Sequence, residues 1–411
     1  MYINRTIKEE IFDRIKTRPV VYISGARQVG KSTLCKEIIK ELSFNYVTLD
    51  DIREKELAIK DPELFLKIHK WPLIIDEVQY APKLFEVIQS IVNKENFDNG
   101  SNYSMFVLTG SQSYQLMDNV TQSMAGRVSI IKMSPLSMSE INGKEEKPFQ
   151  VNALINNERV SKYNISLEEL YSKIIRGFYP ELYKTHTLNS NEFYSNYVRT
   201  YLERDVSNLI NLNNKLKFQN FMEILASMTS QELVYEKLSK AIGVDKKTIQ
   251  NWISILVSGD IITLLQPYNE MSIVKRIVKR PKVYFNDTGL ACYLARINDK
   301  NILMNSMFNG SFVETYIFNE IVKSYTNNIE PVNFYYYRDT NQNEIDLIIL
   351  NKGVLTKVEC KAGISYKTSD VKSFNQLDKS SYKLGDSCII CNTEKIYSID
   401  KAVIALPISA I

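Results

Sequence analysis

The feature that most constrains this chain is a glycine-rich loop near its beginning, set between a strand-like run and a helix-forming stretch. The strand-like run, Val20 to Ile23, is apolar and mostly β-branched, and the helix-forming stretch covers Leu34 to Leu42. Glycines at both ends of such a loop let successive backbone N–H groups turn toward phosphate oxygens, and the following helix adds the positive end of its dipole. The sequence therefore predicts a site for a nucleotide phosphate.

The loop has the complete spacing G-x-x-x-x-G-K-S that is typical of nucleoside triphosphate sites. We expect Lys31 to reach the β- and γ-phosphates of the nucleotide and the Ser32 hydroxyl to coordinate Mg²⁺. A chance glycine-rich turn before a surface helix would not require this full motif. The predicted nucleotide-binding residues are Gly25, Ala26, Arg27, Gln28, Val29, Gly30, Lys31, Ser32 and Thr33.

A second apolar run, Leu73 to Ile75, ends in two carboxylates, Asp76 and Glu77. A carboxylate beside a phosphate loop can hold Mg²⁺ through water, and a second one can orient the water that attacks the γ-phosphate. We assign the first role to Asp76 and the second to Glu77. The alternative is a strand that merely ends in solvated acids, which the phosphate loop upstream disfavours.

The next strand-like run, Met105 to Leu108, ends in hydroxyl side chains. If this strand lies beside the one ending at Asp76, its hydroxyl could contact the γ-phosphate or the attacking water. We choose Ser111 for this role, with Thr109 second. Arg127, after a helical stretch, could enter a neighbouring subunit's nucleotide site and stabilise the charge on the transferred group. It could equally be a surface arginine at a helix end.

These motifs together resemble the AAA+ ATPases of bacteria and archaea that carry a C-terminal domain of uncharacterised function. The resemblance rests on GARQVGKST, LIIDEVQ, VLTGSQS and MAGR, and on residues 201–206 and 284–290, so it covers nearly the whole chain. It implies an α/β multidomain protein whose first domain is a P-loop AAA+ parallel sheet with flanking helices. It also implies ATP as ligand, and little about biological role.

Length and composition fit a multidomain protein with reduced cysteines. The 411 residues are 44% apolar and 24% charged, enough for two or three cores, and the formal charge of +4 is too small to indicate a nucleic-acid partner by itself. No apolar run is long enough for a membrane span and the first residues lack a secretion signal, so we expect a cytoplasmic protein without membrane contact. We interpret Cys388 and Cys391 as buried strand residues, since strand residues three apart point to opposite faces. The two histidines of the chain, His69 and His186, give little basis for a zinc site.

We predict four domains from changes in composition along the chain. They are an ATPase domain at residues 1–142, a helical linker or lid at 143–213, a winged helix-turn-helix-like domain at 214–282 and a nuclease-like domain at 283–411. Within the second domain, Arg204 could sense nucleotide, although a pair with a carboxylate one helical turn away fits better.

The winged-helix hypothesis rests on three helix-forming stretches with short connections, followed by an apolar, β-rich run. The stretches are Phe218 to Met228, Leu233 to Ile242 and Lys246 to Leu256. The third opens with polar side chains that can meet phosphates or base edges. Five cations follow in residues 275–282: Lys275, Arg276, Lys279, Arg280 and Lys282. These cations would contact DNA or RNA phosphates. Alternatively, the helices bind a protein, and the cations only protect the solvent-exposed edge of a strand.

The last domain places three carboxylates and a lysine in a pattern that suggests metal chemistry. Asp346 lies within one predicted strand, while Glu359 and Lys361 share a face of the next one. A hairpin would bring them together, with Glu314 of the preceding helix as a third carboxylate. Glu314, Asp346 and Glu359 would then bind Mg²⁺, and Lys361 would help to activate the attacking water.

This pattern resembles the PD-(D/E)xK nuclease superfamily, which implies a restriction-endonuclease-like α/β domain. The usual proline before the aspartate is absent, because Ile345 precedes Asp346. The alternative is an exposed strand face on which Lys361 forms a salt bridge with a neighbouring acid.

The sequence as a whole predicts an ATP-binding and ATP-hydrolysing protein, with Mg²⁺, that couples its nucleotide state to nucleic-acid binding or to metal-dependent cleavage. We also expect it to form a homo-oligomer if Arg127 acts between subunits. One alternative is an ATP-dependent switch that binds protein partners and keeps an inactive C-terminal scaffold. Another is a transcriptional regulator that binds DNA without cleaving it.

Overall fold

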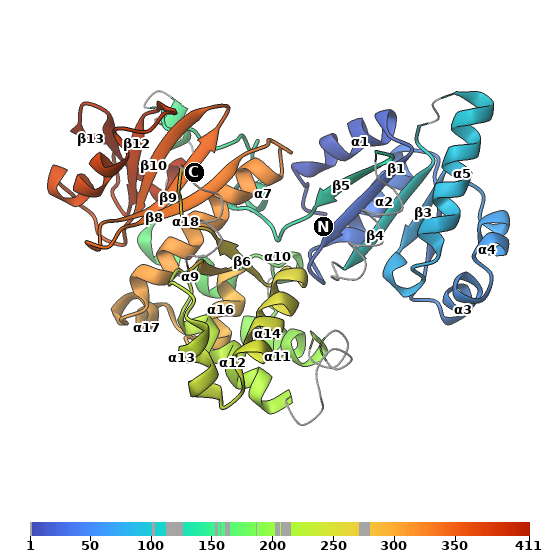
Figure 1. The fold of residues 1–411 in the computed structure, drawn as a ribbon, viewed down its shortest axis with the longest axis horizontal. Coiled ribbons are helices and arrows are strands. Elements are labelled where there is room, and N and C mark those ends of the chain that lie inside the picture. Colours follow the sequence, from blue (N-terminus) through green and yellow to red (C-terminus); the bar gives the residue numbers. More distant parts are fainter. Residues whose placement is uncertain are drawn as a thin grey trace.

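The fold is taken from a computed structural model of the full chain. It describes residues 2–100, 103–111, 126–152, 155–156, 158–160, 165–185, 187–201, 206, 215–270 and 280–411. Figure 1 shows a parallel sheet in blue at one end, a mixed sheet in orange and red at the other, and helices in green and yellow between and below them.

The first sheet has the strand order β2-β3-β4-β1-β5, and all its described pairs are parallel. Strands in such a sheet are covered on both faces and read as continuous apolar runs, as the sequence does here. The bounds are β1 Val20–Gly25, β2 Asn45–Thr48, β3 Leu73–Asp76, β4 Phe106–Ser111 and β5 Val128–Lys132. The predicted parallel sheet is confirmed, and β4 lies between β1 and β3.

Helices cover both faces of this sheet. On one face α1 (Ile7–Thr17) and α2 (Lys31–Glu41) pack with alternate strand residues such as Ile23. On the other face the side chains of α4 (Pro62–Ile68) and α5 (Leu84–Asn99) pack with the intervening strand residues. Two further short elements lie on this side, namely α3 (Ile52–Lys60) and the 3-10 turn η1 (Val78–Tyr80).

The middle of the chain is helical and ends in a two-stranded antiparallel sheet. Its helices are α7 Met138–Ile141, α9 Leu167–Arg176, α10 Pro180–Lys184, α11 Ser190–Tyr201, α12 Lys215–Ser227, α13 Tyr235–Ile242 and α14 Lys246–Ser258, and its strands are β6 Ile262–Leu265 and β7 Lys282–Phe285. The three predicted helices are therefore present. Gly243 ends α13 with φ of +71°, and Asp245 caps α14 by accepting from the backbone N–H of Thr248. The domain boundary expected between residues 282 and 283 falls inside β7.

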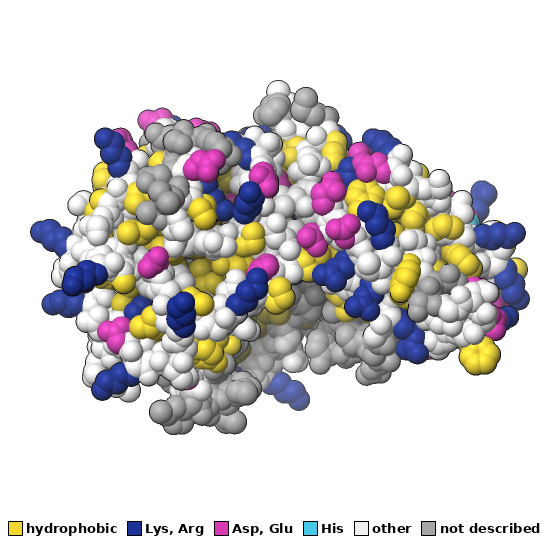
Figure 2. Space-filling model, turned by 90° about the horizontal axis from the view of Figure 1, so that it is seen from above, with side chains coloured by type: hydrophobic (Ala, Val, Ile, Leu, Met, Phe, Trp, Pro, Cys, Tyr) yellow, Lys and Arg dark blue, Asp and Glu magenta, His cyan; other side chains and the backbone are white. Residues whose placement is uncertain are grey.

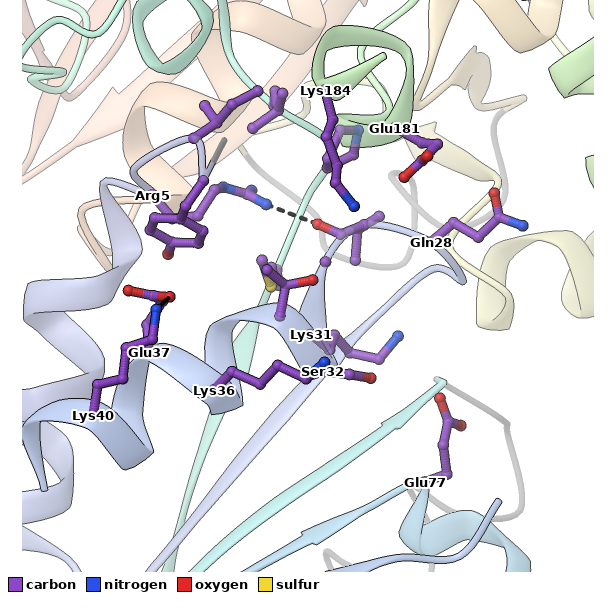
Figure 3. A pocket seen from close by; sticks show the side chains of 18 of the residues that line it. Arg5, Gln28, Lys31, Ser32, Lys36, Glu37, Lys40, Glu77, Glu181 and Lys184 are labelled. Atoms are coloured by element: carbon purple, nitrogen blue, oxygen red, sulfur yellow. Dashed lines mark hydrogen bonds and ion pairs between the residues drawn. The ribbon is translucent and has the colours of Figure 1, made fainter. Parts of the chain in front are cut away.

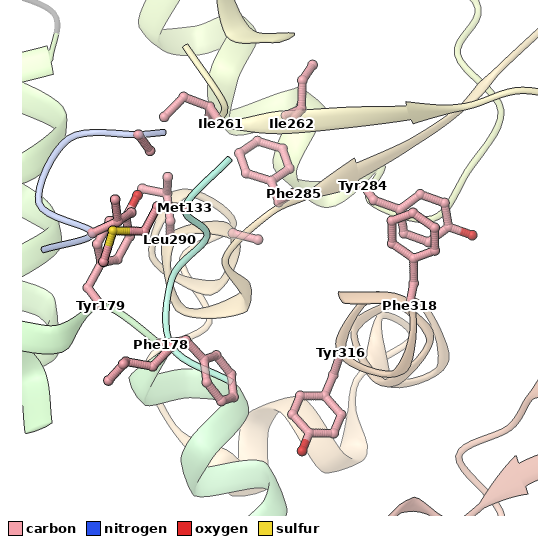
Figure 4. Packing of buried hydrophobic residues seen from close by; sticks show 14 of the residues in the cluster. Met133, Phe178, Tyr179, Ile261, Ile262, Tyr284, Phe285, Leu290, Tyr316 and Phe318 are labelled. Atoms are coloured by element: carbon pink, nitrogen blue, oxygen red, sulfur yellow. The ribbon is translucent and has the colours of Figure 1, made fainter. Parts of the chain in front are cut away.

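One buried aspartate, Asp287, ties the helices of the middle region together. It caps α16 (Thr288–Leu294) by accepting from Leu290 N at 2.8 Å. The same carboxylate accepts from Phe178 N and from the Tyr194 hydroxyl, each at 2.7 Å. Figure 4 shows the apolar core around this region, which includes Met133 after β5, Tyr179 and Leu290.

The last part of the chain is a mixed sheet packed against the long helix α18 (Asn309–Thr326), after the short helix α17 (Lys300–Asn305). Its strand order is β13-β14-β12-β10-β9-β8, with β11 paired to β10. The bounds are β8 Asn333–Arg338, β9 Glu344–Asn351, β10 Val354–Cys360, β11 Lys383–Leu384, β12 Ser387–Cys391, β13 Tyr397–Asp400 and β14 Val403–Pro407, with the 3-10 segments η4 Thr368–Leu377 and η5 Ile408–Ala410.

The antiparallel pair of β9 and β10 confirms the hairpin that the sequence predicts for this domain. Lys352 and Gly353 form the turn between β9 and β10 with positive φ, as a two-residue hairpin turn requires. Cys388 and Cys391 are both buried on β12, and they belong to different apolar clusters on opposite faces, as the sequence predicts. Within the described part of the chain, no helix is both long and apolar enough to cross a membrane.

Candidate functional site

The two glycines of the phosphate loop are required by its backbone geometry. Gly25 has φ of +151°, and a Cβ added to it would lie 2.2 Å from the Met133 carbonyl oxygen. Gly30 has φ of +102° and stands immediately before α2. Both conformations disfavour residues with a side chain, so the loop turns at the two positions that the motif predicts.

Lys31, the first residue of α2, is buried beside this loop. Its ammonium donates to the carbonyl oxygens of Gly25 and Ala26, each at 2.9 Å. Burial lowers the pKa of Lys31, while Glu77 and Asp76 act in the opposite direction. Both of these hydrogen-bond acceptors are neutral carbonyls, so an anion at the loop can compete for this ammonium.

The carboxyl ends of β1, β4 and β3 meet at the same edge of the sheet. Gly25 is paired with Ser111, the last residue of β4, and Ile75 with Leu108. The sheet thus brings Asp76, Thr109 and Ser111 to the loop, as the strand order requires. Glu77 follows with φ of +60° and accepts from the Gln79 amide.

Asp76 is 2% exposed, and both of its oxygens accept hydrogen bonds from neighbouring strands. The Thr109 hydroxyl donates to Oδ1, and the Tyr46 hydroxyl donates to Oδ2 at 2.9 Å. The Thr109 hydroxyl also accepts from Glu77 N at 3.2 Å. Thr109 therefore orients the Asp76 carboxylate and contacts the backbone of Glu77, while the hydroxyl of Ser111 remains the candidate for a phosphate contact. Sequence reasoning missed Tyr46, because a tyrosine on an edge strand carries no motif.

The donor set at this edge fits Mg²⁺. A hydroxyl from Ser32 and a fixed carboxylate from Asp76 are hard oxygen ligands of the kind that this ion takes beside phosphates. The sheet holds Asp76 in one orientation through its two hydrogen bonds, so it can bind the ion directly or through water.

A cavity of about 750 Å³ lies over the loop, between the ATPase sheet and the helical region. Figure 3 shows Lys31, Ser32 and Glu77 on one side of it and Glu181 and Lys184 of α10 on the other. The cavity is lined by Tyr2, Ile3, Arg5, Gln28, Val29, Gly30, Lys31, Ser32, Thr33, Lys36, Glu37, Lys40, Glu77, Met133, Leu136, Pro180, Glu181, Lys184 and Phe193. Its volume falls within the range of small-molecule sites.

Arg5 is a lining residue that sequence reasoning missed. It is buried, and its guanidinium donates to Val29 O at 2.8 Å, to Ser134 O at 2.6 Å and to Glu140 at 3.0 Å. It thereby fastens the first residues of the chain to the phosphate loop and to α7. An isolated arginine before a helix gives no signal of this role in the sequence.

Arg127 lies at the amino-terminal end of β5, whereas the phosphate loop follows the carboxyl-terminal end of β1. It directly precedes β5, whose first residue pairs with Val20 at the start of β1. Six residues of strand separate this level from Gly25, a distance of about 20 Å. Arg127 therefore cannot serve its own subunit's nucleotide. The end of β5 near the loop carries Lys132 instead, which pairs with Asp260 at 2.5 Å.

The helix α14 presents the expected polar residues on its exposed face. Lys246, Lys247, Gln250 and Asn251 are all exposed. Figure 2 shows Lys and Arg side chains scattered over one face of the molecule rather than gathered in one patch. Lys275, Arg276 and Lys279 lie outside the described residues, as do Arg204 and His186.

Lys282 was predicted to belong to the phosphate-contacting cations of residues 275–282, but the structure places it in the interior. It is 2% exposed and forms ion pairs with acids of the last domain, so it is not available to a phosphate at the surface. The strand pairing of β7 explains the difference, because it turns Lys282 inward.

The residues predicted for the C-terminal site do come together. Lys361 lies 2.6 Å from Glu359 and 3.9 Å from Asp346, and Asp346 accepts from Cys360 N at 3.0 Å. Burial raises the pKa of Glu314 to about 7, and burial with the nearby Asp346 raises the pKa of Glu359 to about 8. The hairpin of β9 and β10 creates this proximity, as expected.

Three residues join this cluster that sequence reasoning did not include. Lys282 lies 2.9 Å from Glu314, 2.6 Å from Glu344 and 3.4 Å from Asp346, and the Tyr284 hydroxyl donates to Glu314 at 2.6 Å. Although burial lowers the pKa of Lys282, these acids raise it well above the usual value. The available signal was a lysine at the start of an otherwise apolar strand. Among the residues for which side chains are described, no group of three or more His, Cys, Asp or Glu is arranged to hold a metal ion.

Comparisons with known families match three consecutive parts of the chain. Residues 17–142 match a family described as an AAA domain. Residues 167–301 and 309–411 match two families that are both described as domains of unknown function. The middle match includes β7, in agreement with the pairing of β7 with β6.

Similar proteins are themselves uncharacterised or distant. An uncharacterized protein of Mycobacterium tuberculosis is 24% identical over 399 residues, covering 95% of this chain and 80% of that protein. One of Methanocaldococcus jannaschii is 24% identical over 317 residues, covering 68% and 63%. Among solved structures, a Walker-type ATPase of Pyrococcus abyssi is 12% identical, with a TM-score of 0.45 over 71% of this chain and 96% of that one. The family match and the loop geometry identify residues 17–142 as a P-loop ATPase domain of the AAA type, followed by two domains of unknown function.

Proposed function

We propose that this chain binds ATP together with Mg²⁺ and hydrolyses it at the edge of the sheet where β1, β4 and β3 end. The observation that carries the proposal is the buried Lys31 ammonium, held by two neutral carbonyls at the wall of a 750 Å³ cavity. When bound, Mg²⁺ would offset the charge of the β- and γ-phosphates.

The roles of the residues follow from their positions. Glu77 orients a water in line with the γ-phosphorus, and the bond from that phosphorus to the β–γ bridging oxygen breaks, giving ADP and phosphate. Lys31 and the hydroxyl of Ser111 stabilise the charge on the transferred group. Thr109 and Tyr46 keep Asp76 in one orientation throughout.

The direct test is phosphate release by the full chain, comparing wild type with Lys31→Ala. The matched control is Lys16→Ala, since Lys16 is an exposed lysine on α1. We expect Lys31→Ala to lose at least about 100-fold in rate, the cost of removing a group that stabilises transition-state charge, and Lys16→Ala to keep the rate. Equal rates for wild type and Lys31→Ala would contradict the assignment.

A nucleotide-dependent switch is a second candidate function, supported by a continuous chain of contacts from the loop to the last domain. Arg5 joins the loop carbonyl of Val29 to Glu140 of α7. The backbone N–H of Met138, also on α7, donates to Glu320 of α18 at 2.8 Å. Contiguous contacts of this kind can carry coupling, and only a measurement establishes it.

Hydrogen exchange with and without ATP tests this coupling. We expect ATP to change the protection of α18 in wild type, and Glu320→Gln to reduce that change without altering ATP affinity. The control is Glu330→Gln, which removes a surface ion pair with Lys352. An unchanged response in Glu320→Gln would exclude this route.

Nucleic-acid contact through α14 is also proposed, on the basis of its four exposed polar residues. Anisotropy titrations of labelled DNA and RNA at two salt concentrations should show salt-dependent binding that Lys247→Glu weakens. Binding that is absent at low salt would leave α14 as a protein-contact surface.

Assembly of several copies is proposed as the way in which Arg127 acts. Because it lies about 20 Å from its own loop, Arg127→Ala should lower ATP hydrolysis only at protein concentrations where subunits associate. Light scattering in parallel with the rate measurement decides this.

A further inference from the structure

The C-terminal cluster contains its own cation. Lys282 reaches it from β7, a strand of the small sheet that precedes the last domain. Its ammonium lies 2.6 to 3.4 Å from oxygens of Glu314, Glu344 and Asp346, which come from two elements of the last domain, α18 and β9. One ammonium thus sits among three carboxylates that meet from different directions.

An ammonium and a divalent cation cannot share these oxygens. A divalent ion binds carboxylate oxygens at about 2.0 to 2.6 Å, so an ion held by Glu314 and Asp346 would stand next to Nζ of Lys282. Two cations at that separation repel each other strongly in a buried place. The side chain of Lys282 is only 3% exposed, and its strand β7 is paired with β6.

The surroundings hold Lys282 where it is. The hydroxyl of Tyr284, two residues along β7, donates to Glu314, and the ring of Tyr336 lies 5.6 Å from Nζ. Tyr336 also donates to Glu232, which forms a bridge with Lys282 through the backbone. Both residues of β7 that face the acids are therefore engaged with the last domain.

We propose that Lys282 is the resident cation of this cluster and takes the position that a divalent ion would need. The cluster then fastens β7 to the last domain by ion pairs, and it binds no divalent metal while Lys282 is present. Without a divalent metal in this cluster, residues 309–411 would act as a structural scaffold and not as a metal-dependent nuclease. The proposal is independent of ATP hydrolysis, and its test uses no nucleotide.

The proposal predicts a gain of function. In Lys282→Met, the carboxylates of Glu314 and Asp346 lose their shared ammonium. Glu359 adds an oxygen, Oε2, that is buried and has no hydrogen-bond partner among the described residues. This set of hard oxygen donors should bind Mn²⁺ or Mg²⁺.

The experiment is titration of the nucleotide-free full chain with Mn²⁺, following free Mn²⁺ by electron paramagnetic resonance. The proteins are wild type, Asp346→Asn, Lys282→Met, Lys282→Met with Asp346→Asn, and Lys282→Arg. All share the same phosphate loop, so any Mn²⁺ bound there is common to them. We expect Lys282→Met to gain one site, at least tenfold tighter than any site in wild type, that Asp346→Asn removes. Lys282→Arg keeps the positive charge and should resemble wild type.

Two results would overturn the proposal. One is a Mn²⁺ site in wild type that Asp346→Asn abolishes, because the metal and Lys282 would then coexist. The other is a folded Lys282→Met that gains no site. If Lys282→Met does not fold, the comparison of wild type with Asp346→Asn still decides, since equal Mn²⁺ binding by these two proteins supports the proposal and an Asp346-dependent site refutes it.

Discussion

Two buried lysines, Lys31 beside the phosphate loop and Lys282 on β7, stand in contrasting environments. Lys31 is 5% exposed and Lys282 is 2% exposed, so burial alone does not separate them. Lys31 donates to two neutral carbonyls at the wall of a cavity. Lys282 lies among three carboxylates.

The difference shows how partners decide what a buried charge can do. A buried ammonium with neutral partners stays available to an incoming anion, and its pKa is lowered by burial. An ammonium among carboxylates is already compensated, and the acids raise its pKa well above the usual value. The first arrangement suits ligand binding, whereas the second suits structure.

The largest expected effect concerns the acid at the ATPase edge. Glu77→Gln should reduce ATP hydrolysis about 10³-fold, roughly 4 kcal/mol of activation free energy, because an amide cannot act as a base toward the water. ATP binding should stay near the wild-type level, since Lys31 and the loop are intact. Phosphate release and the binding of a fluorescent ATP analogue measure the two quantities. A mutant that loses binding as well would assign Glu77 to nucleotide affinity.

The contrast between Lys31 and Lys282 is tested by replacing each lysine with methionine and measuring the free energy of unfolding in urea. Lys282→Met should lower the free energy of unfolding by about 3 kcal/mol, because it leaves the buried Glu314 without the ammonium with which it pairs at 2.9 Å. Lys31→Met should change it by less than about 1 kcal/mol, because the loss of two hydrogen bonds to carbonyls is offset by the removal of a buried charge. Equal losses would erase the proposed distinction between the two sites.

The pH dependence of the free energy of unfolding tests the raised pKa of Glu359. The pKa of Glu359 is raised to about 8 by burial and Asp346, against an ordinary value of 4.5, so the native state favours its protonated form. The stabilisation of the native state by the protonated Glu359 carboxyl group is fully present below pH 4.5 and is lost as the pH rises through 8. The free energy of unfolding of wild type should therefore fall by about 3 kcal/mol between pH 5 and pH 8 relative to that of Glu359→Gln, whose amide does not titrate. Parallel pH profiles of the two melting temperatures would contradict the raised pKa.

The smallest effect is expected from Tyr46→Phe. This change removes one hydrogen bond, from the Tyr46 hydroxyl to Asp76 at 2.9 Å. A loss of about 1 kcal/mol corresponds to a three- to tenfold drop in hydrolysis, seen most clearly at limiting Mg²⁺. A rate that does not depend on Tyr46 at any Mg²⁺ concentration would show that Thr109 alone orients Asp76.

The sequence by itself determined the ATPase domain and most element positions, because the information lies in short, contiguous motifs. The loop from Gly25 to Ser32 contains its own turns and its own lysine, and the acids at Asp76 and Glu77 follow directly from a buried strand. The hairpin of β9 and β10 was equally local, and it correctly brought Asp346 to Lys361.

Only the tertiary structure decided which distant side chains complete each site. Arg5 and Tyr46 reach the nucleotide edge from elements that carry no motif, and Arg127 is placed at the far edge by the direction of β5. Lys282 belonged by sequence to a basic surface segment, yet strand pairing turns it into the carboxylate cluster. The face that a strand buries depends on the strand with which it pairs. The charge of a lysine alone therefore does not predict whether its side chain is exposed or buried.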